Sequence, residues 1–325
     1  MAQALLDVRN LSVDYNGCPA VSDVSFSVAP AQVVGIVGES GCGKTSLVSS
    51  LVAALPPSGS VRHGQVLFEG RDLLAMDAKA LCPLLGARIS MVFQNPQAAF
   101  NPVRTMEAQF VQTIRAHTDV SRDQARRMSL EALRAMDLED PQRVLASRSF
   151  ELSGGMCQRA ALALAMVLRP SLIIADEPTS ALDVIAQNCV IEEMKGLNRR
   201  YQTAFILVSH NMGVVFAVAQ TVCVMYAGRV VETGSVADIA HHPMHPYTKA
   251  LMDSMPQLGR KTLPGIPGMP PVLGQAVKGC AFAPRCCHAS DKCFAERADF
   301  RNLGEGRGFA CWKAQAQLAH KAAVE

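Results

Sequence analysis

The amino-acid sequence predicts an α/β fold with a mostly parallel sheet covered by helices, on three observations. Short apolar runs alternate with segments of helical composition along most of the chain, which is typical of parallel strands joined by helices. One apolar run, residues 32–37, ends in a glycine-rich loop that leads directly into a helical segment. The chain has 325 residues, 49% of them hydrophobic, which suffices for about two domains with packed cores.

The expected elements follow in order. Alternating apolar residues predict two short strands over 6–13, with a turn at Asn16-Gly17 after them. The pattern is helical over 105–138, and a hairpin is expected about Ala227-Gly228. The other predicted strands are 24–28, 32–37, 65–68, 89–93, 172–175 and 205–208, and the other helices are 44–55, 156–168, 184–200, 212–219 and 247–255.

Composition and charge exclude several classes of protein. Lys and Arg number 31 against 28 Asp and Glu, and 5% of residues are aromatic, so a basic, stacking surface for nucleic acid is not expected. Polar residues interrupt the apolar stretch 204–225, so no run reaches the ~20 residues of a membrane span. The first residues lack a signal-peptide pattern. We therefore expect a cytoplasmic chain whose 11 cysteines are reduced, as buried apolar residues, metal ligands or bystanders.

Residues 38–45, Gly-Glu-Ser-Gly-Cys-Gly-Lys-Thr, match the G-x-x-x-x-G-K-[ST] pattern of a phosphate-binding loop. Backbone N–H groups of such a loop and the start of its helix hold phosphate oxygens. Lys44 can reach the β- and γ-phosphates, and Thr45 can ligate magnesium. After a second apolar strand, Asp176 would hold the magnesium ion and Glu177 would orient and deprotonate the attacking water.

Residues 152–159, Leu-Ser-Gly-Gly-Met-Cys-Gln-Arg, form a second predicted anion-binding segment. Ser153 is a good helix N-cap, and Gly154 and Gly155 expose backbone donors at the start of the helix. At this segment the sequence resembles the ATP-binding cassette (ABC) family of transport ATPases, because these residues match the family's signature motif.

Other motifs of that family occur in order. Gln94 matches the Q-loop, residues 180–183 match the D-loop with Asp183 at its end, and His210 matches the switch histidine. Tyr15 fits the aromatic residue that stacks on adenine, although it also suits an ordinary sheet position. A lone histidine or amide at a strand end is often structural, so His210 and Gln94 depend on the resemblance.

The resemblance implies an ABC-type P-loop NTPase domain over residues 1–240, with an antiparallel β subdomain and a helical subdomain at about 100–165. In the family two such domains pair head to tail, so the signature motif grips the ATP held by the partner's phosphate loop. The catalytic residues implied are Glu177, His210 and Gln94. Those implied to bind ATP or Mg²⁺ are Tyr15, Gly38, Glu39, Ser40, Gly41, Cys42, Gly43, Lys44, Thr45, Ser46, Gln94, Ser153, Gly154, Gly155, Asp176 and Asp183.

Residues 241–325 resemble the C-terminal extension of the dipeptide, oligopeptide and nickel importer ATPases. Cys280, Cys286, Cys293 and Cys311 are spaced C-x5-C-x6-C-x17-C, and four thiolates suit zinc or iron–sulfur. The resemblance points to a [4Fe-4S] cluster. Other metals or none stay open, because the C-x2-C knuckle of common zinc modules is missing. Cys287 departs from the family pattern.

These features together predict the ATP-hydrolysing subunit of a bacterial importer of di- or oligopeptides, peripheral at the cytoplasmic face of the inner membrane. The resemblance implies a second ATPase subunit in a heterodimer, two transmembrane permeases and an extracytoplasmic solute-binding protein. A nickel or other small-solute importer is the alternative, and a soluble ABC ATPase acting on DNA or ribosomes is a remote one. A third hypothesis makes the C-terminal cysteines a redox or metal sensor, and such a regulatory role is compatible with the peptide importer.

Overall fold

The computed structural model describes residues 4–180, 182–255, 265–272, 274 and 277–322. The chain divides into two compact units. The first unit comprises Met1–Val28, Val33–Leu74 and Ser209–Glu325, and the second comprises Ala29–Gln32 and Ala75–Val208. Each unit therefore draws on segments that are far apart in the sequence.

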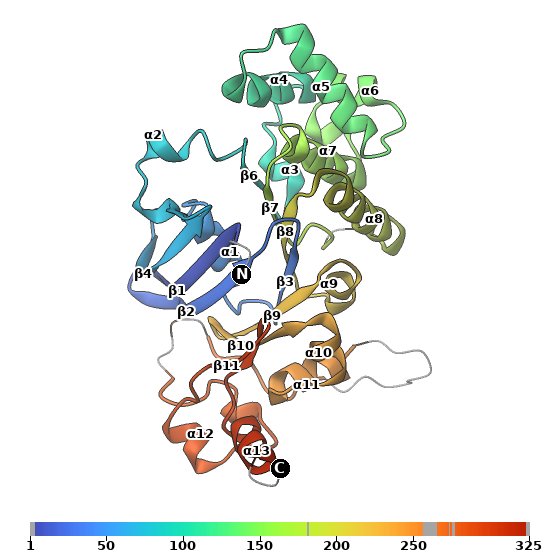
Figure 1. Cartoon of the computed structure of the whole chain (residues 1–325). Coiled ribbons are helices and arrows are strands. Elements are labelled where there is room, and N and C mark those ends of the chain that lie inside the picture. Colours follow the sequence, from blue (N-terminus) through green and yellow to red (C-terminus); the bar gives the residue numbers. More distant parts are fainter. Residues whose placement is uncertain (1–3, 181, 256–264, 273, 275–276, 323–325) are drawn as a thin grey trace. The chain divides into compact units, whose positions relative to one another are not determined.

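The first unit contains an antiparallel sheet with the strand order β2-β1-β4-β5 (Figure 1). The segment predicted as two short strands is one long strand, β1, which is interrupted by register shifts rather than by a turn. Asn16 and Gly17 have φ angles of 50° and 81°, which is the geometry of a tight hairpin, and this confirms the predicted turn. The strands are β1 (Leu6–Tyr15), β2 (Cys18–Val28), β4 (Gly59–Phe68) and β5 (Arg71–Asp72).

A second sheet of the first unit has the order β11-β12-β10-β9-β3. β3 pairs in parallel with β9, and the pairs among the other strands are antiparallel. The predicted hairpin joins β9 to β10 through Ala227 and Gly228, whose φ angles are both positive. The part of the chain that follows β10, called the C-terminal part below, thus extends this sheet by a hairpin of its own. The strands are β3 (Val33–Val37), β9 (Thr221–Tyr226), β10 (Arg229–Ser235), β11 (Arg301–Gly304) and β12 (Arg307–Phe309).

Helices cover the core of the first unit, and β3 is buried along its whole length. Gly35 lets helix α9 approach this strand, because a Cβ there would lie 2.1 Å from Cγ1 of Val215. The helices are α1 (Lys44–Leu51), α9 (Met212–Val218), α10 (Val236–His241), α11 (Pro246–Asp253), α12 (Asp291–Ala295) and α13 (Trp312–Ala322), with short 3₁₀ turns at Leu73–Ala75 and Ala283–Arg285.

The second unit is built on three parallel strands in the order β8-β7-β6, as the alternation of strands and helices predicts. The strands are β6 (Ile89–Val92), β7 (Leu172–Asp176) and β8 (Ala204–Ser209). The helices are α2 (Ala78–Leu81), α3 (Pro96–Ala99), α4 (Met106–His117), α5 (Arg122–Arg134), α6 (Pro141–Ala146), α7 (Gly154–Met166) and α8 (Val184–Tyr201), with a 3₁₀ turn at Ser149–Glu151.

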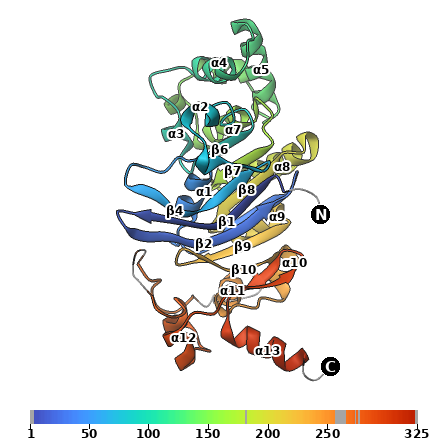
Figure 2. The same cartoon turned by 60° about the vertical axis from the view of Figure 1, so that its left-hand side comes forward.

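The segment predicted as helical over 105–138 contains two helices, α4 and α5. Ser121 begins α5 with a capping box in which its hydroxyl accepts from Gln124 and the Gln124 side chain accepts from its N–H. Thr118 ends α4 in an extended conformation. The two helices pack together around the buried side chains of Val111, Ile114 and Ala125, and they lie away from the strands of their unit (Figure 2).

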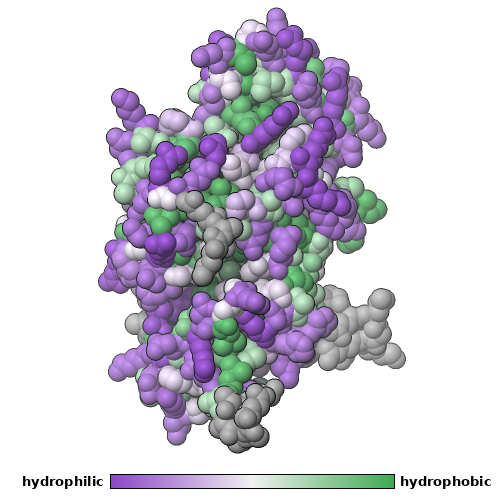
Figure 3. Space-filling model, in the orientation of Figure 1, coloured by the Kyte–Doolittle hydropathy of each residue, from purple (hydrophilic) through white to green (hydrophobic). Residues whose placement is uncertain are grey.

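Apolar side chains also reach the surface. The face seen in Figure 3 shows apolar patches among polar side chains. In the second unit the exposed apolar side chains are Phe93, Val103, Phe150, Val184 and Ile185, and in the C-terminal part they include Phe294, Phe300 and Leu303. Among the described residues, no helix is both long enough and apolar enough to cross a membrane.

A buried polar turn holds α11 in the first unit. The Glu232 carboxylate, 1% exposed, accepts from the N–H groups of Met244 and His245 at 2.7 and 2.8 Å. The His245 ring is also buried, and its Nδ1 accepts from the N–H of Tyr247 at 3.1 Å. Burial lowers the pKa of His245 to about 4, so the ring is neutral in the folded protein at pH 7.

This neutral histidine makes the stability of the first unit depend on pH. Because the folded pKa lies below that of an unfolded histidine, His245 contributes stability above about pH 6.5 that is lost as the pH falls toward 4, up to about 3 kcal/mol. The variant His245→Asn keeps a helix-capping acceptor without titrating. We expect the thermal midpoint of the wild type to fall more between pH 6.5 and 4.5 than that of the variant. Parallel curves would contradict this assignment.

Candidate functional site

The phosphate-loop residues lie between β3 and α1, as the sequence predicts. Gly43 is the N-cap of α1 and has a φ of 100°, a conformation that side-chain-bearing residues rarely adopt. A Cβ at Gly43 would also lie 2.6 Å from the carbonyl oxygen of Ala20. Glycine is therefore required here both by the backbone conformation and by the close approach of a neighbouring strand.

Lys44 is buried within its own loop, and its ammonium donates to the carbonyl oxygens of Gly38 and Glu39 at 2.8 and 3.1 Å. Thr45, the next residue, is exposed. Burial raises the pKa of the Cys42 thiol, so this cysteine is a neutral small residue of the loop. The loop thus encloses a cationic side chain and is followed by an exposed threonine in the first turn of α1, which are the residue types that suit phosphate and magnesium binding.

Two further predicted residues belong to the first unit. Tyr15 ends β1 opposite Gly59 of β4, and a Cβ on Gly59 would lie 2.9 Å from the Tyr15 ring. The ring therefore packs on a glycine of the antiparallel sheet. His210 is exposed and lies between β8 and α9, whose N-cap is the adjacent Asn211.

The second unit gathers Gln94, Asp176 and Glu177 at one edge of its parallel strands. Val92 at the end of β6 pairs with Ala175 of β7, so Gln94 and Asp176 both lie just past the paired ends. Asp176 is 2% exposed, whereas Gln94 is exposed. Glu177 has a φ of 48° and donates its N–H to the carbonyl of Val208 at 2.9 Å. This is the edge at which open α/β sheets bind ligands.

The signature residues begin α7 as expected. The Ser153 hydroxyl caps the helix by accepting from the N–H of Met156 at 3.3 Å. Gly154 faces open space, because a Cβ added there would meet nothing within 4 Å. The N-terminal end of this long helix is therefore accessible to an anion. Nearby, Asp183 caps α8 by accepting from the N–H of Ala186 at 2.8 Å.

Sequence reasoning missed two residues that contact the phosphate loop. The Arg285 guanidinium forms two bonds to the Glu39 carboxylate, at 2.7 and 2.9 Å. The Tyr247 hydroxyl accepts from the N–H of Glu39 at 2.8 Å. Both residues come from the C-terminal part, more than 200 positions away along the chain. No spacing pattern could have found them, because the contacts arise only when the C-terminal part packs on the loop.

The four predicted cysteine ligands lie in one region of the first unit. Burial raises the pKa of Cys280, and charge on Cys293, Cys311 or Cys286 would raise it further. Burial likewise raises the pKa of Cys286 and of Cys311. The N–H of Cys280 also donates to the carbonyl of Cys293 at 2.7 Å. Within the described residues, no three His, Cys, Asp or Glu side chains are arranged to hold a single metal ion.

The other cysteines differ from these four. Burial raises the pKa of Cys157, in the signature helix, to about 11 and that of Cys223, in β9, to about 12, so both thiols are neutral packing residues. Cys287, which follows Cys286, is exposed.

Comparison with known proteins extends these observations. The ABC transporter family matches residues 21–180, and the oligopeptide/dipeptide transporter C-terminal region matches residues 231–293. A probable peptide ABC transporter ATP-binding protein of Sinorhizobium fredii is 41% identical over 320 residues, which are 96% of this chain and 96% of the relative. A probable D,D-dipeptide transport ATP-binding protein of Escherichia coli is 41% identical over 326 residues, covering 98% of this chain and 99% of the relative.

Solved structures show the same fold. A dimeric bacterial ABC transporter cassette matches with a TM-score of 0.65 and 24% identity, covering 71% of this chain and 98% of the cassette. A dimeric cassette in a post-hydrolysis state with ADP and Pi matches with a TM-score of 0.64 and 23% identity, covering 71% and 98%. The predicted α/β P-loop NTPase fold is thus confirmed. With the relatives above, these matches place the chain in the ABC transporter family of ATP-binding proteins, whose members hydrolyse ATP, and in the branch with an oligopeptide/dipeptide transporter C-terminal region.

Proposed function

We propose that this ATPase powers a bacterial importer of di- or oligopeptides. The observation that carries the proposal is the C-terminal region at residues 231–293, which is the oligopeptide/dipeptide transporter type. The names of the relatives in Sinorhizobium fredii and Escherichia coli support the same substrate class. In this proposal residues 1–240 form the ATPase domain, with its helical subdomain at about 100–165, and residues 241–325 form the extension.

In this proposal the predicted site residues have the roles that the family resemblance implies. The loop from Gly38 to Ser46 binds the ATP phosphates, with Lys44 neutralising charge on the β- and γ-phosphates, and Tyr15 stacks on adenine. Thr45 and Asp176, assisted by Gln94, hold Mg²⁺. Glu177 accepts a proton from the attacking water, and His210 orients the γ-phosphate.

A second ATPase subunit completes the site. The open N-terminus of α7, with Ser153, Gly154 and Gly155, is built to grip a phosphate. In a head-to-tail pair this grip serves the partner's ATP, with Asp183 near the contact. The exposed Val184 and Ile185 beside Asp183 support a protein contact at this end of α8. Since the relatives are peptide transport subunits, we propose a heterodimer with a related ATPase.

The membrane partners are two separate permease subunits, which receive substrate from an extracytoplasmic solute-binding protein. Phe93 is 49% exposed and Val103 is 79% exposed, and they flank the Gln94 segment. Such exposed apolar side chains mark a docking surface, and we assign it to the permeases. The ATPase then lies at the cytoplasmic face of the inner membrane.

Glu177→Gln tests the catalytic role of this carboxylate. The amide preserves the size of the side chain but cannot accept the proton, so turnover should fall at least about a hundredfold while MgATP still binds. ATP hydrolysis and binding of a fluorescent ATP analogue measure the two effects. Glu131→Gln, an exposed glutamate of α5, is the matched control and should hydrolyse ATP normally. Hydrolysis at the wild-type rate in Glu177→Gln would refute the assignment.

The substrate class is tested with the ATPase assembled with its permeases and solute-binding protein in vesicles. We expect di- or oligopeptides to stimulate ATP hydrolysis several-fold, with uptake of labelled peptide, and nickel ions to have no effect. Stimulation by nickel alone would replace the peptide proposal with the nickel importer.

We further propose that the C-terminal cysteines hold a [4Fe-4S] cluster. A donor set of four thiols suits soft metal centres and iron–sulfur clusters. A four-iron cluster is larger than one ion and takes thiolates that lie farther apart. The four thiols lie in one region, but among the described residues they form no site for a single ion. This spacing is compatible with the larger size of a four-iron cluster. Lys292, which lies 3.5 Å above the Trp312 ring, supports the arrangement because it joins the elements next to Cys293 and Cys311.

Two neighbouring cysteines provide a matched test of the cluster. Protein purified without oxygen should be brown and contain about four iron and four sulfide ions per chain. Cys286→Ser should lose most of this iron, whereas Cys287→Ser, at the exposed neighbour, should retain it. Iron-free wild-type protein would contradict the proposal, and zinc in its place would favour a different metal centre.

A further inference from the structure

Glu39 of the phosphate loop is held by three other groups of the first unit. Its carboxylate receives the two bonds from Arg285, its N–H donates to the Tyr247 hydroxyl, and its carbonyl accepts from Lys44. The side chain, the donor and the acceptor of this one residue are therefore all fixed. Because Glu39 follows Gly38 at the start of the loop, these bonds restrict the path of the backbone that must bend around the phosphates.

The Arg285 side chain is almost fully enclosed at 4% exposure, against 25% for Glu39. Its Nε donates to the carbonyl of Pro267 at 2.7 Å, and one terminal nitrogen also reaches the Tyr226 hydroxyl at 3.2 Å. A two-bond contact between guanidinium and carboxylate is geometrically specific and stronger than a single bond. The hydrogen bonds to Pro267 and Tyr226 therefore hold the guanidinium in the orientation in which it binds Glu39.

An aromatic cluster supports the same contact. The ring of Tyr226 lies 4.5 Å from that of Tyr247 and 5.3 Å from that of Phe282, and Tyr247 lies 5.3 Å from Phe282. Tyr226 and Tyr247 are fully buried. This cluster joins the end of β9, the start of α11 and the segment before Arg285 into one packed layer beneath the phosphate loop.

Arg285 also lies within the cysteine segment. Between Cys280 and Cys286 the backbone forms successive tight turns, with Ala283 bonded to Cys280, Arg285 to Phe282 and Cys286 to Ala283 at 2.9, 2.9 and 3.2 Å. These bonds fix the backbone between the two cysteines, and Arg285 lies within it. We therefore expect a displacement of Cys280 or Cys286 to be transmitted to the ion pair between Arg285 and Glu39.

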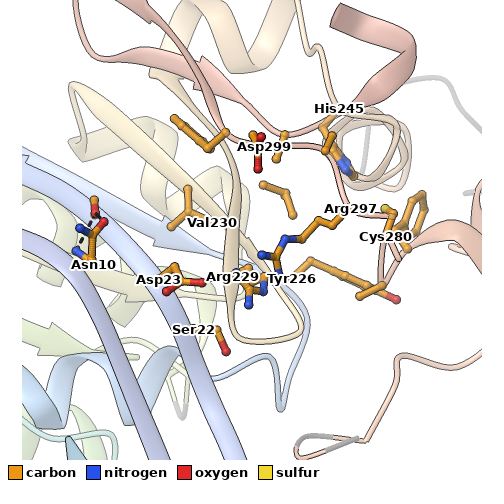
Figure 4. A pocket seen from close by; sticks show the side chains of 17 residues that line it. Asn10, Ser22, Asp23, Tyr226, Arg229, Val230, His245, Cys280, Arg297 and Asp299 are labelled. Atoms are coloured by element: carbon orange, nitrogen blue, oxygen red, sulfur yellow. Dashed lines mark hydrogen bonds and ion pairs between the residues drawn. The ribbon is translucent and has the colours of Figure 1, made fainter. Parts of the chain in front are cut away.

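A cavity of about 410 Å³ reaches one of these thiols from solvent. Its walls include Cys280, Phe282 and Tyr226. Figure 4 shows Asp23 beside Arg229 on one side of the cavity, and His245 and Cys280 on the other. A small reagent can therefore approach Cys280 close to the aromatic cluster.

We propose that Arg285 is a positioning residue of the phosphate loop and that, through its ion pair with Glu39, nucleotide binding is coupled to the chemical state of Cys280 and Cys286. The inference rests on the proposed function only in that the loop binds ATP. It holds whether the cysteines bind an iron–sulfur cluster, another metal or no metal. Coupling between two sites acts in both directions. Loss of order at the thiols weakens nucleotide binding, and bound nucleotide protects the thiols.

The first experiment is a double-mutant cycle on the full chain. Binding of a fluorescent ATP analogue with Mg²⁺ is measured for the wild type, Arg285→Gln, Glu39→Gln and the double variant. We expect each single variant to bind about tenfold more weakly and the double variant to be no weaker than either, because each change breaks the same ion pair. In steady-state hydrolysis the loss should appear mainly as a higher KM for ATP.

Arg297→Gln is the matched control, since Arg297 is an exposed arginine of the same C-terminal part that lines the cavity. It should bind nucleotide as the wild type does. Glu39→Gln keeps the shape of a loop residue and tests the pair even where Arg285→Gln unfolds. Single variants that bind as tightly as the wild type, or single effects that simply add in the double variant, would overturn the inference. A wild type that binds no ATP would instead refute the proposed function.

The second experiment measures the reverse direction of the coupling. Protein is first treated with a metal chelator, so that thiols holding a metal also become reactive, and the chelator is then removed. The protein is exposed to iodoacetamide with or without MgATP, and alkylation of Cys280 and Cys286 is followed by mass spectrometry. We expect MgATP to slow alkylation several-fold in the wild type but not in Arg285→Gln, while exposed Cys287 reacts at the same rate throughout. Equal rates with and without MgATP in the wild type would overturn the coupling.

Discussion

The bend of the phosphate loop is the constraint on which the first unit depends. A chain that leaves buried β3 and enters α1 within a few residues must adopt a left-handed conformation at Gly43, pressed against the backbone of β2 at Ala20. Such a bend turns backbone N–H groups inward, which suits them to phosphate but leaves the loop with few bonds of its own. Lys44 supplies part of the missing support from inside the loop.

The rest of that support comes from the C-terminal part. Arg285 and Tyr247 bind Glu39 from outside the loop, and β12 pairs with β10 so that the C-terminal hairpin joins the main sheet of the first unit. Buried Glu232 then holds the turn into α11 by accepting two backbone N–H groups. The C-terminal part is therefore packed into the first unit and contacts the phosphate loop directly.

In the second unit, two features of the backbone direct polar groups toward a possible ligand. Parallel pairing of β6 and β7 brings Gln94, Asp176 and Glu177 to one edge, where carboxylates can meet a metal ion and a water. The open N-terminus of α7 concentrates backbone donors at Gly154. Neither feature needs a long-range side-chain contact, because strand ends and helix starts direct polar groups by their backbone geometry alone.

Features set by local backbone geometry could be predicted from the sequence, whereas contacts between distant side chains could not. The phosphate loop, the Asp176–Glu177 pair and the Ser153 cap are local patterns, so motif and spacing were enough to predict them, together with the α/β fold and both hairpin turns. The helical character of residues 105–138 was predicted, but the boundary between its two helices was not, because the structure sets it by the capping box at Ser121. The grip of Arg285 on Glu39 was beyond sequence reasoning, since any exposed acid could have been its partner. Only packing of the C-terminal part decides which carboxylate this arginine meets, because burial excludes water and leaves a single geometry that satisfies both charges.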